Sequence, residues 1–266
     1  MNTFFSRVYC LDSGLHTGEE NMEFDRRLMA SFLEGRFQQR FGEQSCLWRF
    51  YGWQPHAITV GYNQNIDGLN QAKCHAAGID VVRRPTGGRA VFHAEEFTYS
   101  FFTESTEQNS TLYRLVHEVI QHALKELGIH AEFCRSTLTR PQSTSSPDSV
   151  SCFTASARYE LQVDGRKLVG SAQRRNRNVL LQHGSLPLSS RHKELCSFIA
   201  LPAGESFDAL QEDMVEEMER KTTSLEETLG YIPEFSRLAE LMRQAAGAMH
   251  SVEVISLHPN DLSAIF

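Results

Sequence analysis

The sequence lacks the long apolar stretches that membrane and exported proteins carry. It contains no run of about 18 apolar residues, the length that a membrane-spanning helix needs. Residues 1–13 also lack the apolar core of an export signal. We therefore expect a cytoplasmic protein with no membrane partner. No internal repeat is present, and 266 residues with 41% hydrophobic side chains suffice for one large domain, or for one domain with a small annex.

Cysteines and histidines at metal-binding spacings are also absent. The cysteines form no C-x-x-C motif, and the histidines form no H-x-x-H or H-E-x-x-H pattern. Without an export signal, the cysteines are expected to be free thiols rather than a disulfide framework. We therefore expect neither a metal site nor a cofactor. The six cysteines are Cys10, Cys46, Cys74, Cys134, Cys152 and Cys196.

An overall excess of positive charge, the footprint of nucleic-acid binding, is missing. The net charge is −7, so no nucleic-acid partner is expected. The charge is nevertheless uneven, because residues 166–177 hold five basic side chains and no acid, whereas residues 205–227 hold nine acids. The basic segment either steers an acidic protein partner toward this surface or is simply the solvated end of a strand.

The predicted helices and strands follow one another in a mixed order. Apolar residues at helical spacing predict helices, and alternating or β-rich runs predict strands. The expected helices cover residues 21–34, 112–127 and 235–249, and the expected strands cover 47–62 with a break near 53–55, 79–84, 90–103, 178–188 and 251–257. Because these elements do not alternate as regular β-α-β units, the order predicts an α+β fold with a mixed sheet.

A tight hairpin is predicted at Asp164-Gly165, a dipeptide typical of two-residue turns. It joins a strand at 159–163 to a return strand at 166–170, so that Gln162 pairs with Lys167. A lysine this close to a turn is usually a surface residue. Periodicity does not decide whether its face meets water or lines a pocket.

Two polar features accompany the helix predicted at 112–127. His117 and His122 lie five positions apart and do not share a helical face, so both are expected at the surface. Residues 137–150 are rich in Ser, Thr and Pro and lack periodicity, which predicts an exposed loop. This loop ends just before Cys152.

The segment from Arg83 to His93 reads RRPTGGRAVFH. Its two glycines allow the backbone to approach a ligand closely, and its arginines offer charge for a phosphate or carboxylate. The spacing is neither that of a P-loop nor that of a G-x-G-x-x-G motif. By itself the segment fits a ligand-binding loop or an ordinary turn.

Three segments taken together, RRPTGGRAVFH, GRKLVGSAQRR and LQHGSL, resemble the lipoate-protein ligase A and biotin ligase superfamily. The resemblance covers about residues 9–188, and the combination is specific although each piece alone is weak. It implies a mixed sheet flanked by helices, similar to the catalytic core of biotin protein ligases. We expect residues 1–202 to form an acyltransferase catalytic core and residues 203–266 to form a helical C-terminal extension packed on it.

The resemblance also implies which residues surround the bound acyl chain. In this family a glycine-rich loop and a lysine embrace a lipoyl or octanoyl group, and Lys167 stands at the position of that lysine. The residues implied around the acyl pocket are Arg84, Thr86, Gly87, Gly88, Arg89, His93 and Lys167, with Gly170, Ser171 and Ala172 as the nearby wall.

Within the superfamily, the sequence most resembles the cysteine-dependent octanoyltransferases. The loop reads TGGR, where many ATP-dependent ligases have a third glycine. Cys152 stands just upstream of the lysine motif, where that branch has its acyl-bearing cysteine. Ala94 follows His93 where ligases commonly have an aspartate, which disfavours a ligase role for this loop. The resemblance therefore implies an octanoyltransferase of protein lipoylation.

A cysteine and a lysine suit this chemistry. The Cys152 thiolate attacks the donor thioester, and an amine of the acceptor then attacks the acyl-enzyme. The Lys167 ammonium favours the thiolate and can hold the carbonyl oxygen as it becomes negative. The expected donor is octanoyl-acyl carrier protein. The expected acceptor is a lipoyl-carrier protein such as glycine cleavage H protein or a 2-oxoacid dehydrogenase lipoyl domain.

Other functions compete with this one. An ATP-dependent lipoate–protein ligase would use free lipoate, and an amidotransferase would move the group from one lipoyl carrier to another. A non-catalytic binder of acylated carriers would have no need for Cys152 or Lys167. A papain-like protease is disfavoured because its C-G-S-C-W type signature is missing.

Overall fold

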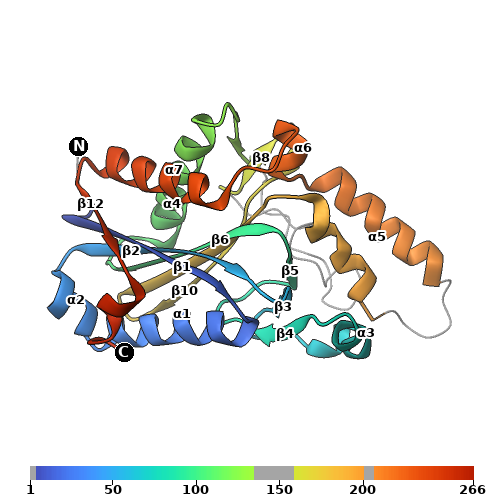
Figure 1. The fold of residues 1–266 in the computed structure, drawn as a ribbon, viewed down its shortest axis with the longest axis horizontal. Coiled ribbons are helices and arrows are strands. Elements are labelled where there is room, and N and C mark those ends of the chain that lie inside the picture. The colour runs from blue at the N-terminus through green and yellow to red at the C-terminus, as the bar shows by residue number, and fades with distance from the viewer. Residues whose placement is uncertain (1–3, 135–158, 201–206) are drawn as a thin grey trace.

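The described residues, 4–134, 159–200 and 207–266, form an irregular succession of strands and helices in this computed structural model (Figure 1). The strands are β1 (Arg7–His16), β2 (Ser45–Trp53), β3 (Ala57–Val60), β4 (Asp80–Arg83), β5 (Val91–His93), β6 (Glu96–Glu104), β7 (Glu132–Phe133), β8 (Leu161–Val163), β9 (Arg166–Lys167), β10 (Gly170–Asn176), β11 (Val179–Pro187) and β12 (Val254–Leu257). The helices are α1 (Gly18–Leu33), α2 (Arg36–Phe41), α3 (Gln71–Ala76), α4 (Asn109–Lys125), α5 (Phe207–Lys221), α6 (Leu225–Leu229) and α7 (Phe235–His250), with short 3-10 segments at Ile66–Gly68, Ser190–Phe198 and Pro259–Leu262.

The main sheet of the described residues has the strand order β10-β11-β6-β2-β1-β12. β1 runs parallel to β2 and β12, whereas β2, β6, β11 and β10 pair antiparallel in turn. Two smaller sheets, β4-β3-β5 and β7-β8-β9, accompany it. The predicted α+β fold with a mixed sheet is therefore confirmed.

Different helices cover the two faces of the main sheet (Figure 1). α1 and α2 pack on one face, where Phe32 and Phe37 join the core with Leu47 of β2. α4 and α7 pack on the other face, where Val119 joins Trp48 of β2. Because side chains alternate along a strand, consecutive residues of β2 serve opposite layers. This explains why β2 is buried along its whole length.

The start of α1 differs from its prediction. The helix begins at Gly18, before the predicted start at Asn21, because Thr17 and Glu20 form a capping box. The Thr17 hydroxyl accepts a hydrogen bond from the Glu20 N–H, and the Glu20 carboxylate accepts one from the Thr17 N–H. This polar signal precedes the apolar spacing on which the prediction rested.

The single strand predicted at 90–103 is wrong. It is divided into β5, which pairs with β3, and β6, which pairs with β2 and β11. Glu95 lies between them with φ of +48°, a left-handed conformation that turns the chain from one sheet to the next. The prediction joined the aromatic and β-branched residues on both sides into one strand and overlooked the His-Ala-Glu-Glu interruption at residues 93–96.

The predicted hairpin is confirmed. Asp164 and Gly165 have φ of +49° and +75°, as a two-residue turn requires, and Gln162 pairs with Lys167. Further along the chain, β12 pairs with β1, and Leu238 and Met242 of α7 join the same hydrophobic core as α4. Within the described residues, no helix has the length and apolar character required to cross a bilayer.

Candidate active site

The main sheet, α1 and the β4-β3-β5 sheet border a pocket. Most of the surface that faces the pocket is apolar, and polar groups converge on it from several strands. The lining residues are Met22, Tyr51, Trp53, Thr59, Arg84, Val91, His93, Thr98, Lys167, Gly170, Ser171, Ala172, His183, Gly184 and Ser185.

Lys167 lies in the wall of this pocket. Its side chain is only 5% exposed, and its ammonium nitrogen lies 2.8 Å from a carboxylate oxygen of the equally buried Glu160. A charged pair is stable at such depth only while both members are present. The interpretation of Lys167 as a surface residue is therefore wrong, and Glu160 fixes the position of its ammonium group.

The C-terminal part of the chain holds the main chain of Lys167. Thr223 donates its N–H to the Lys167 carbonyl oxygen at 3.0 Å, and Thr222 forms an isolated β-bridge with the same residue. Both threonines are fully buried. The segment between α5 and α6 thus reaches the pocket wall, a contact that no sequence pattern indicates.

β10 presents Ala172 to the pocket and the Ser171 side chain to α4, because neighbouring side chains alternate. The Ser171 hydroxyl lies 2.7 Å from the Tyr99 hydroxyl and 2.8 Å from His117 Nε2. His117 Nδ1 donates to the Tyr159 carbonyl oxygen at 2.5 Å, and burial lowers the pKa of His117 to about 4. The prediction of a surface His117 is wrong, because this histidine joins α4 to β10.

Arg84 braces the glycine-rich loop. Its guanidinium group donates to the carbonyl oxygens of Thr59, Gly87 and Arg89 at 3.2, 2.8 and 2.7 Å. It also donates to the Thr59 hydroxyl at 3.1 Å. Arg84 therefore lines the pocket and fixes the path of the loop. Gly87, Gly88 and Arg89 lie on the loop, outside the lining that the described residues define.

A close backbone contact locks this loop against the end of β3. A Cβ atom on Gly61 would lie 1.9 Å from the Gly88 carbonyl oxygen, a distance that no side chain tolerates. Gly88 has φ of +97°, in the region that favours glycine. Beside this contact, the Tyr62 N–H donates to the Thr86 carbonyl oxygen at 2.8 Å. The loop is thus held by main-chain contacts.

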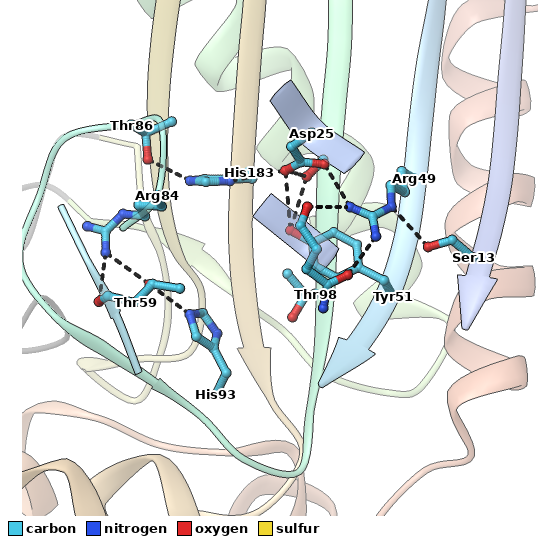
Figure 2. A network of polar contacts seen from close by, with 12 residues as sticks. Ser13, Asp25, Arg49, Tyr51, Thr59, Arg84, Thr86, His93, Thr98 and His183 are labelled. Atoms are coloured by element: carbon cyan, nitrogen blue, oxygen red, sulfur yellow. Dashed lines mark hydrogen bonds and ion pairs between the residues drawn. The ribbon is translucent and has the colours of Figure 1, made fainter. Parts of the chain in front are cut away.

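Thr86 joins the loop to a buried charged network (Figure 2). Its hydroxyl lies 2.6 Å from His183 Nε2, and His183 Nδ1 lies 3.5 Å from Asp25 Oδ2. Arg49 donates to Asp25 Oδ1 at 2.8 Å, and both of these side chains are fully buried. Ser100 donates to Asp25 Oδ2 at 2.7 Å. The network therefore links α1, β2, β6 and β11 beneath the pocket.

The surroundings of Asp25 and His183 set their charges. Burial alone raises the pKa of Asp25, but the hydrogen bond from His183 and the charge of Arg49 outweigh it and lower that pKa below its ordinary value. Burial lowers the pKa of His183, against the opposing effect of Asp25. Asp25 is therefore a carboxylate, and His183 is a neutral imidazole that donates from Nδ1 toward Asp25 and accepts from Thr86 at Nε2.

His93, elsewhere in the pocket wall, has the same kinds of partner as His183. Its Nδ1 lies 2.7 Å from Glu96 Oε1, and its Nε2 lies 2.9 Å from the Thr59 hydroxyl. Trp53 stacks on the imidazole, with ring centroids 4.1 Å apart. Burial alone raises the pKa of Glu96, but the charge and hydrogen bond of His93 outweigh it and lower that pKa. Both pocket histidines thus have a carboxylate at one ring nitrogen and a threonine hydroxyl at the other.

The elements that form this pocket all fall within one family match. Residues 17–247 match the Lipoyl protein ligase A/B catalytic domain. The chain belongs to this family. The resemblance that rested on three short motifs is therefore confirmed.

Relatives within the lipoyl protein ligase A/B family are octanoyltransferases. Octanoyltransferase LipM of Exiguobacterium sp. (strain ATCC BAA-1283 / AT1b) is 40% identical over 233 residues, which cover 83% of this chain and 78% of the relative. Octanoyltransferase LipM of Bacillus subtilis (strain 168) is 35% identical over 226 residues, which cover 82% and 77%. The predictions of an acyltransferase, and of an octanoyltransferase in protein lipoylation, are thereby confirmed.

Solved structures share the fold of this family. The bi-partite lipoate protein ligase of Thermoplasma acidophilum superposes with a TM-score of 0.68 at 14% identity, covering 98% of this chain and 91% of that one. P. falciparum LipL1, in complex with lipoate, superposes with a TM-score of 0.68 at 16% identity, covering 97% and 70%. At these identities the likeness shows the fold alone, and it is the lipoate-ligase fold that was predicted.

Several partners of the predicted pocket residues were missed in the sequence. Asp25 lies between Met22 and Leu28 on the apolar spacing of α1, and that placement was the available signal. Glu96 gave no such signal, because buried polar residues such as Thr98 and Ser100 lie on the same strand. Thr59 and Trp53 carry no comparable signal, because their partner His93 is distant in sequence. Glu160 lies only seven positions before Lys167, on the strand face where the predicted hairpin also places Lys167. In the described residues, no three His, Cys, Asp or Glu side chains are grouped to hold a metal ion.

Proposed function

We propose that this chain transfers an octanoyl group from octanoyl-acyl carrier protein, through a thioester on Cys152, to a lysine of a lipoyl-carrier protein. The acceptor is of the class of glycine cleavage H protein or a 2-oxoacid dehydrogenase lipoyl domain. The observation that carries this proposal is the 40% identity to a LipM octanoyltransferase over 83% of the chain.

The pocket has the chemistry that an octanoyl thioester needs. Its apolar lining suits the hydrocarbon chain, and Lys167 places an ammonium group in the same wall. An ammonium group has three N–H donors, so its bond to Glu160 is compatible with donation to a substrate oxygen. Such a donor stabilises the carbonyl oxygen as negative charge develops on it.

Cys152 and the loop predicted at 137–150 lie outside the described residues, and four buried cysteines, Cys10, Cys46, Cys74 and Cys196, support Cys152 by contrast. The five described cysteines are free thiols. The thiolate is the reactive form of cysteine, and burial disfavours it. Burial raises the pKa of Cys10 to about 12 and that of Cys196 to about 11, and it also raises the pKa of Cys46 and Cys74.

The proposed reaction runs in two balanced steps. The Cys152 thiolate attacks the donor carbonyl carbon, a new carbon–sulfur bond forms, and the donor thiolate leaves. The neutral amine of the acceptor lysine then attacks the acyl-enzyme, forming an amide and releasing the Cys152 thiolate. The amine proton passes to the donor thiolate. One thioester is thus exchanged for one amide and one thiol, and no nucleotide is consumed.

Intact-protein mass spectrometry tests this function. The enzyme is mixed with octanoyl-acyl carrier protein and a lipoyl-carrier protein in EDTA without ATP, and the acceptor is expected to gain one octanoyl group. Without acceptor, the enzyme itself should gain an octanoyl group that hydroxylamine removes. Acceptor modification only with free lipoate, ATP and magnesium would identify an ATP-dependent ligase. Modification only from another acylated lipoyl domain would identify an amidotransferase.

A further inference from the structure

The rim of the pocket beside β10 is formed by two chain segments that carry positive charge and no acid. Residues 81–94 and 165–193 contain no aspartate or glutamate, although the net charge of the chain is −7. Both segments contribute to the pocket wall. Arg83 and Arg174 belong to them, and in the described part of the chain neither lies within ion-pair distance of a carboxylate. Their charges are therefore available to a ligand from outside.

The two arginines meet at one exposed tyrosine. Arg83 donates to the carbonyl oxygens of Gly61 and Tyr62 at 2.6 and 3.0 Å. Arg174 lies over the Tyr62 ring, with its guanidinium carbon 4.7 Å from the centroid, and donates to the Pro85 carbonyl oxygen at 2.9 Å. Tyr62 is 53% exposed. These neutral partners orient the guanidinium groups and leave their net charge unchanged.

The sheet places this rim at a defined distance from the pocket wall. Ala172 and Arg174 share the pocket face of β10, since residues two apart point the same way. Gly170 begins β10 in the pocket wall, and Arg174 lies four residues further, roughly 13 Å at about 3.3 Å per residue. A group bound at Arg174 is therefore outside the pocket, and a chain of that length along β10 reaches the pocket wall at Gly170.

We propose that Arg83 and Arg174 bind the phosphate of the phosphopantetheine arm of an acidic acyl carrier protein. The proposal rests on the proposed function, in which the donor thioester is carried at the end of such an arm. The phosphate stands at the protein end of the arm and the acyl thioester at the other end, so a phosphate held at the rim leaves the acyl end free to enter the pocket. Arginine is the side chain best suited to phosphate oxygens, and the acid-free rim attracts an acidic carrier.

Three donors distinguish a phosphate site at Arg174 from its other possible roles. They are octanoyl-acyl carrier protein, octanoyl-phosphopantetheine and octanoyl-pantetheine, which lacks the phosphate. The wild type is compared with Arg174→Gln, with Arg174→Lys, which keeps the charge, and with Arg114→Gln as a control. Arg114 lies on α4 in an exposed ion pair with Glu118. Thermal unfolding checks that each variant is folded.

The phosphate site predicts a donor-dependent loss. Arg174→Gln should lower kcat/KM about tenfold with both phosphate-bearing donors and flatten its dependence on salt, because a rim charge acts through association. Octanoyl-pantetheine should be used almost as well as by the wild type. Arg174→Lys should lose much less, and Arg114→Gln should behave as the wild type.

Other outcomes overturn the proposal in distinguishable ways. Equal losses with all three donors would show that Arg174 only braces Tyr62 and the glycine-rich loop. A lower kcat/KM with the carrier protein but not with octanoyl-phosphopantetheine would show that Arg174 contacts the surface of the carrier protein and not the phosphate. If a free nucleotide were instead the ligand of this site, it would inhibit transfer from all three donors equally, including octanoyl-pantetheine, and the phosphate of the arm would be excluded. Wild-type enzyme that uses none of the three donors would refute the proposed function itself.

Discussion

Replacing Asp25 by asparagine should destabilise this protein far more than the small change in shape suggests. The substitution removes one charge from a pair whose two side chains are 0% exposed. Arg49 would keep its charge in the interior, with the neutral oxygens of Asn21 and Ser13 as remaining partners. Removing one member of a buried pair costs about 3–5 kcal/mol, because the other charge stays buried without a counter-charge.

A loss of this size is a large part of the total stability of a folded domain, about 5–15 kcal/mol. For a chain of this length each kcal/mol lowers Tm by about 2–4 °C, so Asp25→Asn should lower Tm by about 6–20 °C. Thermal and urea unfolding at neutral pH measure the change. Glu118→Gln is the matched control, because the Arg114–Glu118 pair has a similar distance, 2.7 Å, but its side chains are 58% and 31% exposed. It should cost less than about 1 kcal/mol.

A double variant checks that the uncompensated charge is the cause. Arg49→Met combined with Asp25→Leu leaves no buried charge in the pair, so it should be more stable than the sum of the two single losses predicts. Strict additivity would refute the coupling between Asp25 and Arg49. An Asp25→Asn loss no larger than that of Glu118→Gln would refute the assignment of Asp25 as a buried carboxylate.

Cys152→Ala should abolish both the octanoyl adduct and transfer, as seen by intact mass, whereas Cys74→Ala should leave both intact; comparable transfer by Cys152→Ala would exclude the thioester route. Lys167→Ala should lose most transfer and also about 3–5 kcal/mol of unfolding free energy, because the buried Glu160 carboxylate loses the positive charge of its ion-pair partner; normal turnover would exclude a role in catalysis. Stability in urea should fall from pH 7 to pH 5, because burial lowers the pKa of His117 and His192 to about 4. The unfolded chain binds these protons near pH 6.5 and the folded chain does not, so a rise in stability on acidification would contradict this.

Elements with one continuous apolar face were predictable from sequence. α4 shows this, since its stripe includes Leu112, Val116 and Val119 and all three are buried. The Asp164-Gly165 turn was predictable because its backbone conformation depends on local residues. The turn at Glu95 was not predicted, because the His-Ala-Glu-Glu interruption is short and the residues on both sides of it favour strands.

The residues of the candidate site also divide into those that the sequence predicts and those that it does not. Arg84, His93 and Lys167 lie in motifs whose residues are neighbours in sequence, and the structure brings all three to one pocket. The carboxylates that hold the pocket residues are less accessible to sequence reasoning. Asp25 reaches His183 from 158 positions away because α1 packs across β11. Such a pairing depends on the tertiary fold, so no local pattern predicts it.

The contact between Gly61 and the Gly88 carbonyl oxygen constrains how this pocket can change by mutation. Every coding change at Gly61 adds at least a methyl group, and that atom would lie 1.9 Å from backbone rather than from a side chain. A clash with a side chain can be relieved by a second substitution that trims the neighbour, but a carbonyl oxygen cannot be trimmed. No compensating single substitution therefore exists, and a saturation library at this codon, selected for lipoylation, should return glycine alone.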